Sequence, residues 1–170
     1  MRRWIVCVPI LLSLSPIAAS QAPSSEVRLD LVTYKQLGNE IKSLQGRVIL
    51  VDFWADYCMP CKQKFPAVQS LHKRYAKNGL SVVTVSVDNV TDPDVRERVK
   101  MFLRQQQSSC RNLLLAEKPE VWISKLKMDS IPSMFLFDKQ GHLINRWTGG
   151  EIDLAAIEKR IVELLNSESK

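Results

Sequence analysis

Two cysteines and one aspartate stand out as candidates for chemistry. Cys58 and Cys61 form a Cys-x-x-Cys pair, and Asp52 precedes the first of them by six residues, inside the apolar run 48–54. A buried carboxyl group and two close thiols are each costly to keep, so their combination indicates a reactive site. At this spacing the two sulfur atoms can form a disulfide within one turn of helix. Thiol–disulfide exchange is therefore the first chemistry to consider.

Cys58 is expected to lie at a helix N-terminus, because Pro60 is well tolerated in the first helical turn. Unsatisfied N–H groups and the helix dipole at such a position lower the pKa of a thiol from about 8.5 to roughly 3.5–7.5. Cys58 would then attack a substrate disulfide and Cys61 would resolve the mixed disulfide; the reverse steps oxidise a dithiol. The spacing does not decide between these directions.

Asp52 is a candidate acid–base group. Burial in an apolar strand raises the pKa of a carboxyl group, and a base poised near neutrality could take the proton of Cys61 when that thiol attacks. The alternative is that Asp52 lies at the frayed end of its strand with its carboxylate in water.

Other uses of the cysteines are less well supported. A zinc site needs about four ligands, and the sequence has no second close cysteine pair. A structural disulfide that closes so small a loop would add little stability. We therefore expect no metal and no cofactor. Cys110 is predicted to be a small buried apolar residue, with a regulatory or intermolecular thiol as the alternative.

The N-terminus has the pattern of an export signal. Arg2 and Arg3 are followed by an apolar run to about Leu14 and by small residues up to Ala22. This pattern predicts a signal peptide over residues 1–22, a linker over 23–30 and one domain over 31–170. The apolar run is shorter than the roughly 20 residues of a membrane-spanning helix. We expect an exported protein, soluble in a periplasmic or other extracytoplasmic compartment after cleavage, with an uncleaved anchor as the alternative.

The composition suits one globular domain, with 45% hydrophobic and 25% charged residues in a chain of 170. The formal net charge is +6, and loss of Arg2 and Arg3 with the signal would lower it by two. The densest basic stretch, residues 96–111, lacks the interleaved aromatic residues of nucleic-acid-binding surfaces. We therefore expect no nucleic-acid partner.

Hydrophobic periodicity predicts the elements that position these residues. Helices and strands alternate over most of the chain, and two apolar runs near the end form a hairpin. Asp92 is predicted as an N-cap, with Pro93 as the first helical residue. This order predicts an α/β fold with a central mixed sheet and helices on both faces. The predicted helices are 33–44, 60–78, 93–107, 119–127 and one after the hairpin, and the strands are 47–54, 80–87, 112–115, 134–137 and 143–147.

The stretch from Val51 to Lys62 closely resembles the active-site sequence of thioredoxins. It reads Val-Asp-Phe-Trp-Ala, then two residues, then Cys-Met-Pro-Cys-Lys. Pro66 matches the proline of the thioredoxin active-site helix, and Ile131-Pro132-Ser133 resembles the cis-proline loop of that family. An added helix–strand unit over 88–115, behind an export signal, is similar to the TlpA and ResA type of extracytoplasmic thioredoxin.

This resemblance implies a thioredoxin fold and a thiol–disulfide oxidoreductase. Cys58 would be the nucleophile, Cys61 the resolving thiol and Asp52 the buried acid–base group. The usual role in the group is reduction of disulfides in exported proteins, with electrons from a membrane partner. An oxidant or isomerase using the same residues, and a non-catalytic client-binding module, remain alternatives. The implied substrate-binding residues are Trp54, Tyr57, Met59, Pro60, Ile131, Pro132 and Gly149.

Three positions depart from the thioredoxin pattern. Tyr57 replaces the tryptophan that commonly precedes the first cysteine, and Met59 replaces the usual glycine between the cysteines. Thr84 occupies the place of the lysine that thioredoxins set against the buried aspartate. Tyr57 and Met59 are both expected at the rim of the site, where the bulky Met59 enlarges the apolar contact surface. Thr84 removes a cation from the expected surroundings of Asp52.

Overall fold

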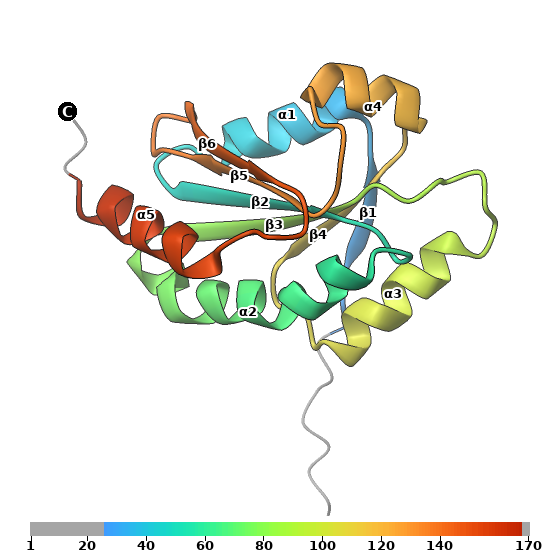
Figure 1. Cartoon of the computed structure of the whole chain (residues 1–170), viewed down its shortest axis with the longest axis horizontal. Coiled ribbons are helices and arrows are strands. Elements are labelled where there is room, and N and C mark those ends of the chain that lie inside the picture. Colours follow the sequence, from blue (N-terminus) through green and yellow to red (C-terminus); the bar gives the residue numbers. More distant parts are fainter. Residues whose placement is uncertain (1–25, 168–170) are drawn as a thin grey trace, which may run out of the picture.

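A mixed sheet forms the centre of the molecule, in a computed structural model that describes residues 26–167 (Figure 1). The predicted signal peptide lies outside the described residues. The strand order is β1-β4-β3-β2-β5-β6. The strands are β1 (Leu29–Val32), β2 (Val48–Trp54), β3 (Leu80–Ser86), β4 (Arg111–Leu115), β5 (Ser133–Phe137) and β6 (Leu143–Thr148). The helices are α1 (Tyr34–Ser43), α2 (Met59–Tyr75), α3 (Val95–Gln105), α4 (Pro119–Leu126) and α5 (Leu154–Asn166), with a 3-10 turn at Ala76–Asn78.

Helices cover the sheet on both faces, as predicted. Helices α1 and α4 lie over one face, α2 and α5 lie over the other, and α3 packs beside α2 (Figure 1). The rings of Phe65 in α2 and Phe102 in α3 have centroids 5.1 Å apart, which ties these two helices together. In the part of the chain that the structure describes, no helix combines the length and apolar character needed to span a bilayer.

Strand β2 is the element on which the site is built. All of its residues are buried, because helices cover both faces of the sheet and the strand lies between two others, β3 in parallel and β5 in antiparallel pairing. A continuous run of apolar and β-branched residues is typical of a strand that is covered on both faces. The predicted central strand is therefore confirmed, and its carboxyl end leads directly to the cysteines.

Strand β1 was not predicted. Its four residues pair in parallel with β4, and Leu29 and Val32 are buried there. Leu29 and Asp30 fall in the range 23–30 that the sequence analysis assigned to a linker. A four-residue strand at the edge of a sheet carries too short a pattern to be recognised, and its conformation depends on pairing with a partner more than 80 positions away in the sequence.

Helix α3 begins later than predicted. Asp94, not Asp92, is the residue before the helix, and its side chain makes no capping hydrogen bond. The Asp92 carboxylate instead accepts a hydrogen bond from the backbone N–H of Asp94 at 3.0 Å and pairs with Arg98 at 2.6 Å. Asp92, predicted as the cap, therefore stabilises the turn that precedes α3. Helix α3 and strand β4 form the predicted inserted unit over 88–115.

Candidate active site

The two cysteines lie where β2 passes into α2. The backbone N–H of Cys58 donates to the carbonyl of Ala55 at 3.0 Å, and the N–H of Lys62 donates to the carbonyl of Cys58 at 3.1 Å. Cys58 is thus the N-cap of α2, and Pro60 lies in the first turn as predicted. The tight turn and the first helical hydrogen bond together fix the cysteine backbone on both sides.

Cys58 and Cys61 form a disulfide, with their Cα atoms 5.3 Å apart. The backbone N–H of Cys61 points at the Cys58 sulfur, at 3.3 Å. A donor in this position stabilises negative charge on Cys58 once the disulfide is reduced. The exposed fraction is 7% for Cys58 and 2% for Cys61, so Cys58 is the cysteine that an incoming group reaches more easily.

Asp52 is buried in β2, with only 2% of its surface exposed. The alternative of a frayed strand end in water is therefore wrong. Burial raises the pKa of Asp52 to about 7. Thr84 is its direct neighbour in the sheet, at the place expected for the thioredoxin lysine. The Thr84 hydroxyl donates to Asn112 at 2.9 Å, so the cation is replaced by a neutral side chain that is engaged elsewhere.

A buried polar network extends from Thr84, and the sequence analysis did not identify it. The side-chain oxygen of Asn112 accepts from Thr84 and from Ser108, the latter at 2.7 Å. Gln69 of α2 donates to Ser108 at 2.6 Å, and its carbonyl oxygen accepts from the Cys110 thiol at 3.3 Å. Polar residues within otherwise apolar helix and strand patterns were the only signal of this network in the sequence. It joins α2 to β3 and β4 beneath the site.

Cys110 is a free, buried cysteine, as predicted. Burial first, and then the nearby charge of Asp52, raise the pKa of Cys110 to about 12. The reactive form of a cysteine is the thiolate, so this thiol is poorly suited to exchange. Its position favours a packing role with one hydrogen bond over a regulatory role.

The segment around Pro132 meets the end of β2. The peptide bond between Ile131 and Pro132 is cis, as the thioredoxin resemblance implies. Ser133, the next residue, pairs with Phe53 near the end of β2. Gly149 has a φ of +93° and donates its N–H to the carbonyl of Pro132 at 2.9 Å. The sheet register therefore brings the Pro132 loop and Gly149 to the end of the sheet where β2 passes into the cysteine loop.

The rim residues divide into two groups. Tyr57 is 74% exposed and Met59 is 63% exposed, and Pro60 is also exposed. Trp54, which the resemblance placed among substrate-binding residues, is only 1% exposed. Its ring packs against Phe65, with centroids 5.3 Å apart, so it supports the core under the site and does not line its surface. Its indole N–H finds no acceptor in residues 26–167.

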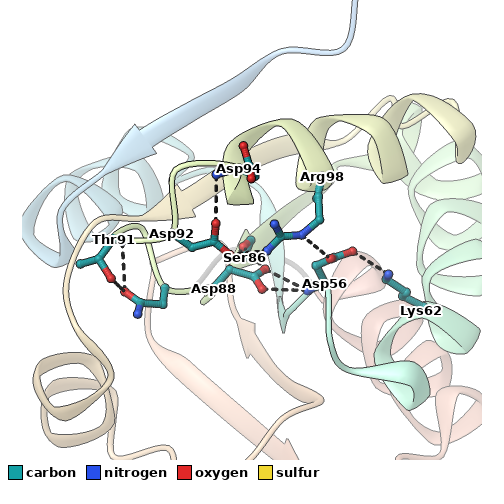
Figure 2. Close-up of polar contacts among 9 residues, drawn as sticks. Asp56, Lys62, Ser86, Asp88, Thr91, Asp92, Asp94 and Arg98 are labelled. Carbon is teal, nitrogen blue, oxygen red and sulfur yellow. Dashed lines mark hydrogen bonds and ion pairs between the residues drawn. The ribbon is translucent and has the colours of Figure 1, made fainter.

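A charged cluster holds the loop before Cys58 (Figure 2). The Asp56 carboxylate pairs with Lys62 of α2 at 2.6 Å and with Arg98 of α3 at 3.2 Å. The backbone N–H of Asp56 donates to the Asp88 carboxylate at 2.9 Å, and burial chiefly raises the pKa of Asp88. The inserted helix therefore contacts the active-site loop directly. The sequence alone does not reveal this cluster, because the charges that form it come from three separate segments.

Comparison with known proteins agrees with this geometry. The family model described as thioredoxin-like matches residues 46–143. The thiol-disulfide oxidoreductase ResA of one Bacillus cereus strain is 24% identical over 110 residues, which are 65% of this chain and 60% of ResA. The chain therefore spans about 60% of the length of the first curated relatives that it matches.

Solved structures show the same fold. A Chlorobium tepidum protein assigned as thiol:disulfide interchange protein DsbE superposes with a TM-score of 0.61 and 26% identity, covering 74% of this chain and 85% of that chain. StoA from Bacillus subtilis superposes with a TM-score of 0.54 and 22% identity, covering 68% and 82% of the two chains, and at this identity the likeness concerns the fold alone. The predicted thioredoxin fold is confirmed.

Proposed function

We propose that this chain, a member of the thioredoxin-like family, carries out thiol–disulfide exchange on exported proteins. Its resemblance to ResA supports this activity, and we propose that it acts mainly as a reductant. The observation that carries the proposal is the Cys58–Cys61 disulfide at the start of α2, whose more exposed sulfur receives a backbone N–H. The reactive pair and the donor belong to one rigid turn, so no rearrangement is needed to form the nucleophile.

In the proposed reaction the reduced pair attacks a client disulfide. The Cys58 thiolate bonds to one client sulfur, and the other client sulfur leaves as a thiolate and takes up a proton. The Cys61 thiol then loses its proton and attacks the Cys58 sulfur. This step re-forms the Cys58–Cys61 disulfide and releases the second client sulfur as a thiol. Two electrons pass from the pair to the client.

Asp52 is proposed to accept the proton of Cys61. A base with a pKa near 7 is half ionised at neutral pH, which suits it to both receive and return a proton. Because Thr84 replaces a cation beside it, burial alone accounts for the raised pKa. The transfer runs directly or through one water molecule.

Client binding is proposed at the rim formed by Tyr57, Met59, Ile131 and Gly149, with the buried Pro132 fixing the backbone next to Ile131. Tyr57 and Met59 offer exposed apolar surface beside Cys58. An extended client can add as a strand along the backbone edge at Ile131, which precedes β5. Backbone recognition of this kind tolerates many client sequences, as a general reductant of exported proteins requires.

The charges near Cys58 support the direction of reduction. A strong oxidant holds its reduced form in an unusually stable state, through extra stabilisation of the thiolate. Here Lys62, the cation nearest to the pair in the sequence, is engaged with Asp56. A cation engaged in this way stabilises the thiolate less than a free one would, which favours a pair that gives up its electrons. A reductant in an extracytoplasmic compartment needs a membrane protein as its electron donor, and we include such a donor in the proposal.

Insulin reduction by the domain from residue 23, driven by dithiothreitol, tests the activity. We expect Cys58→Ser to abolish turnover and Cys110→Ser to leave it unchanged. Asp52→Asn should slow release of the client, so that the mixed disulfide with Cys58 accumulates. If the wild-type domain is folded and its thiols react with an alkylating agent but insulin is not reduced, the chain is a client-binding module and the proposal is wrong.

The redox equilibrium against dithiothreitol and glutathione, followed by alkylation, tests the direction. A potential near or below about −270 mV, the value of thioredoxin, supports the reductant. A potential approaching about −120 mV, as in a strong oxidant, would reverse the proposed direction while leaving the exchange chemistry in place.

A further inference from the structure

Residues of α1, the end of α4 and the β5–β6 hairpin line a groove. Helices α1 and α4 cover the same side of the sheet (Figure 1). The volume of the groove is about 490 Å³. None of the residues that we propose for exchange chemistry or client binding lines it. A site in this groove would therefore be separate from the cysteine pair.

The walls of this groove carry positive charge only. Lys35, Lys42, Lys125 and Arg146 line it, and no aspartate or glutamate of the described residues does. Within residues 26–167 the three lysines form no ion pair. The Arg146 guanidinium donates to the carbonyl of Leu126 at 2.9 Å and lies 4.5 Å from the Phe135 ring centroid, so its position is held. Four cations without a matching acid leave the groove complementary to an anion.

The floor of the groove is apolar. Ile41 of α1 and Phe137 of β5, both partly buried, line it together with Leu37 and Phe135, which belong to the buried core. Leu143 at the hairpin is 36% exposed, which extends the apolar surface to the rim. An apolar floor beneath charged walls is typical of a small-molecule site with a few polar groups that orient the ligand.

Gly38 is the feature of the groove that packing does not explain. It lies in the middle of α1, where glycine is less favourable than any residue except proline. A Cβ atom added at Gly38 would meet nothing within 4 Å. The rest of the chain therefore does not require a glycine here, and its missing side chain leaves the helix backbone open to the groove. Close approach of a ligand to the backbone is one of the established uses of glycine.

We propose that this groove binds a small amphiphile with an anionic head group and an apolar chain. The lysines and Arg146 would hold a carboxylate or phosphate head, and the apolar floor would take the chain. The volume falls within the range of roughly 300–1,000 Å³ for small-ligand sites. A folded protein partner would need a much larger surface, of about 800 Å² on each side. The head-group chemistry is shared by free fatty carboxylates and by anionic membrane lipids.

Fluorescence titration with dansylated undecanoate tests this site. We expect saturable binding that decanoate and decyl phosphate displace and decyltrimethylammonium does not. The double change Lys35→Gln and Lys42→Gln should weaken binding by about tenfold, the effect of losing two exposed charge interactions. Gly38→Leu should abolish binding by filling the groove. Circular dichroism checks that each variant is folded.

Two matched controls keep the test specific. Gly38→Ala adds only a methyl group in open space and should retain binding, and Lys159→Gln removes an exposed lysine of α5 and should have no effect. Absence of saturable binding, equal displacement by the cationic amphiphile, or equal weakening by Lys159→Gln would overturn the proposal.

Vesicles distinguish the two sources of the head group. Sedimentation with vesicles that contain anionic phospholipid, lost in Gly38→Leu, would identify a membrane lipid as the ligand. Binding of decanoate without vesicle binding would identify a free carboxylate. Insulin reduction should stay at the wild-type level in every groove variant, so failure of this site and failure of the proposed exchange activity are separately visible.

Discussion

Replacing Asp52 by asparagine should stabilise the folded protein at alkaline pH and much less at acidic pH. Asp52 is 2% exposed, and its carboxyl group receives no cation from its neighbour Thr84 in the sheet. Above its folded-state pKa the wild-type protein must bury a negative charge. Asparagine has nearly the same shape and stays neutral, so the variant avoids that charge at every pH.

The size of the effect follows from the raised pKa of Asp52, which burial moves from 3.8 to about 7. One pKa unit corresponds to roughly 1.4 kcal/mol, so charge burial costs about 4 kcal/mol of stability once the group is fully ionised. Because the pKa of Asp52 is higher in the folded state than in the unfolded state, these roughly 4 kcal/mol of folding stability are fully present below pH 3.8. This stability is lost as the pH rises through about 7.

Urea unfolding of the oxidised domain at about pH 5 and about pH 8.5 measures the difference. Part of the loss has already accumulated by about pH 5, so the advantage of Asp52→Asn should grow by about 3 kcal/mol between the two conditions. Burial also raises the pKa of Asp88, but this contribution is common to both proteins and cancels. Asp94→Asn, at an exposed acid, is the control and should show no comparable change. An Asp52→Asn advantage that is the same at both pH values would refute the assignment of Asp52 as a buried group that titrates near neutrality.

The charged cluster around Asp56 predicts opposite effects of two substitutions. Asp56→Asn removes a negative charge near Cys58 and should speed alkylation of the reduced thiol at about pH 6, whereas Arg98→Gln removes a positive charge and should slow it. Each change in rate should be about two- to fivefold, which corresponds to the roughly 0.5–1 kcal/mol of a partly exposed ion pair. Changes of the same sign would mean that the cluster acts by holding the loop and not by its charge. Cys110→Ser should lower the thiol count in denaturant by one. It should reduce the free energy of unfolding in urea by only about 1 kcal/mol, because the serine hydroxyl keeps the hydrogen bond to Gln69. Loss of insulin reduction in this variant would contradict a packing role. Phe65→Ala should cost about 3–5 kcal/mol in the same assay, since the ring is fully buried between Trp54 and Phe102, and a cost below about 1 kcal/mol would show that these aromatic contacts are not formed.

Much of the fold could be predicted because its signals are local. Strand β2 is a continuous apolar run, α2 repeats its apolar residues at helical spacing, and the β5–β6 hairpin is two apolar runs around a turn. Each of these patterns is complete within a few residues, so the sequence carries it without reference to the rest of the chain. The error at β1 occurred where pairing with a remote strand decides the conformation, and the error at the start of α3 occurred because the Asp92 carboxylate bonds to Arg98 and to the backbone N–H of Asp94 and does not cap the helix.

The chemistry can be read from the residues alone: a Cys-x-x-Cys pair at a helix start, preceded by an acid in a buried strand. The surroundings of that chemistry depend on how the segments pack. The tertiary structure placed Trp54 in the core, engaged Thr84 with Asn112 and joined Asp56 to Arg98 across 42 positions of the chain. A motif requires residues close together in sequence, whereas the charges, donors and apolar surfaces that tune it come from segments that only folding brings together.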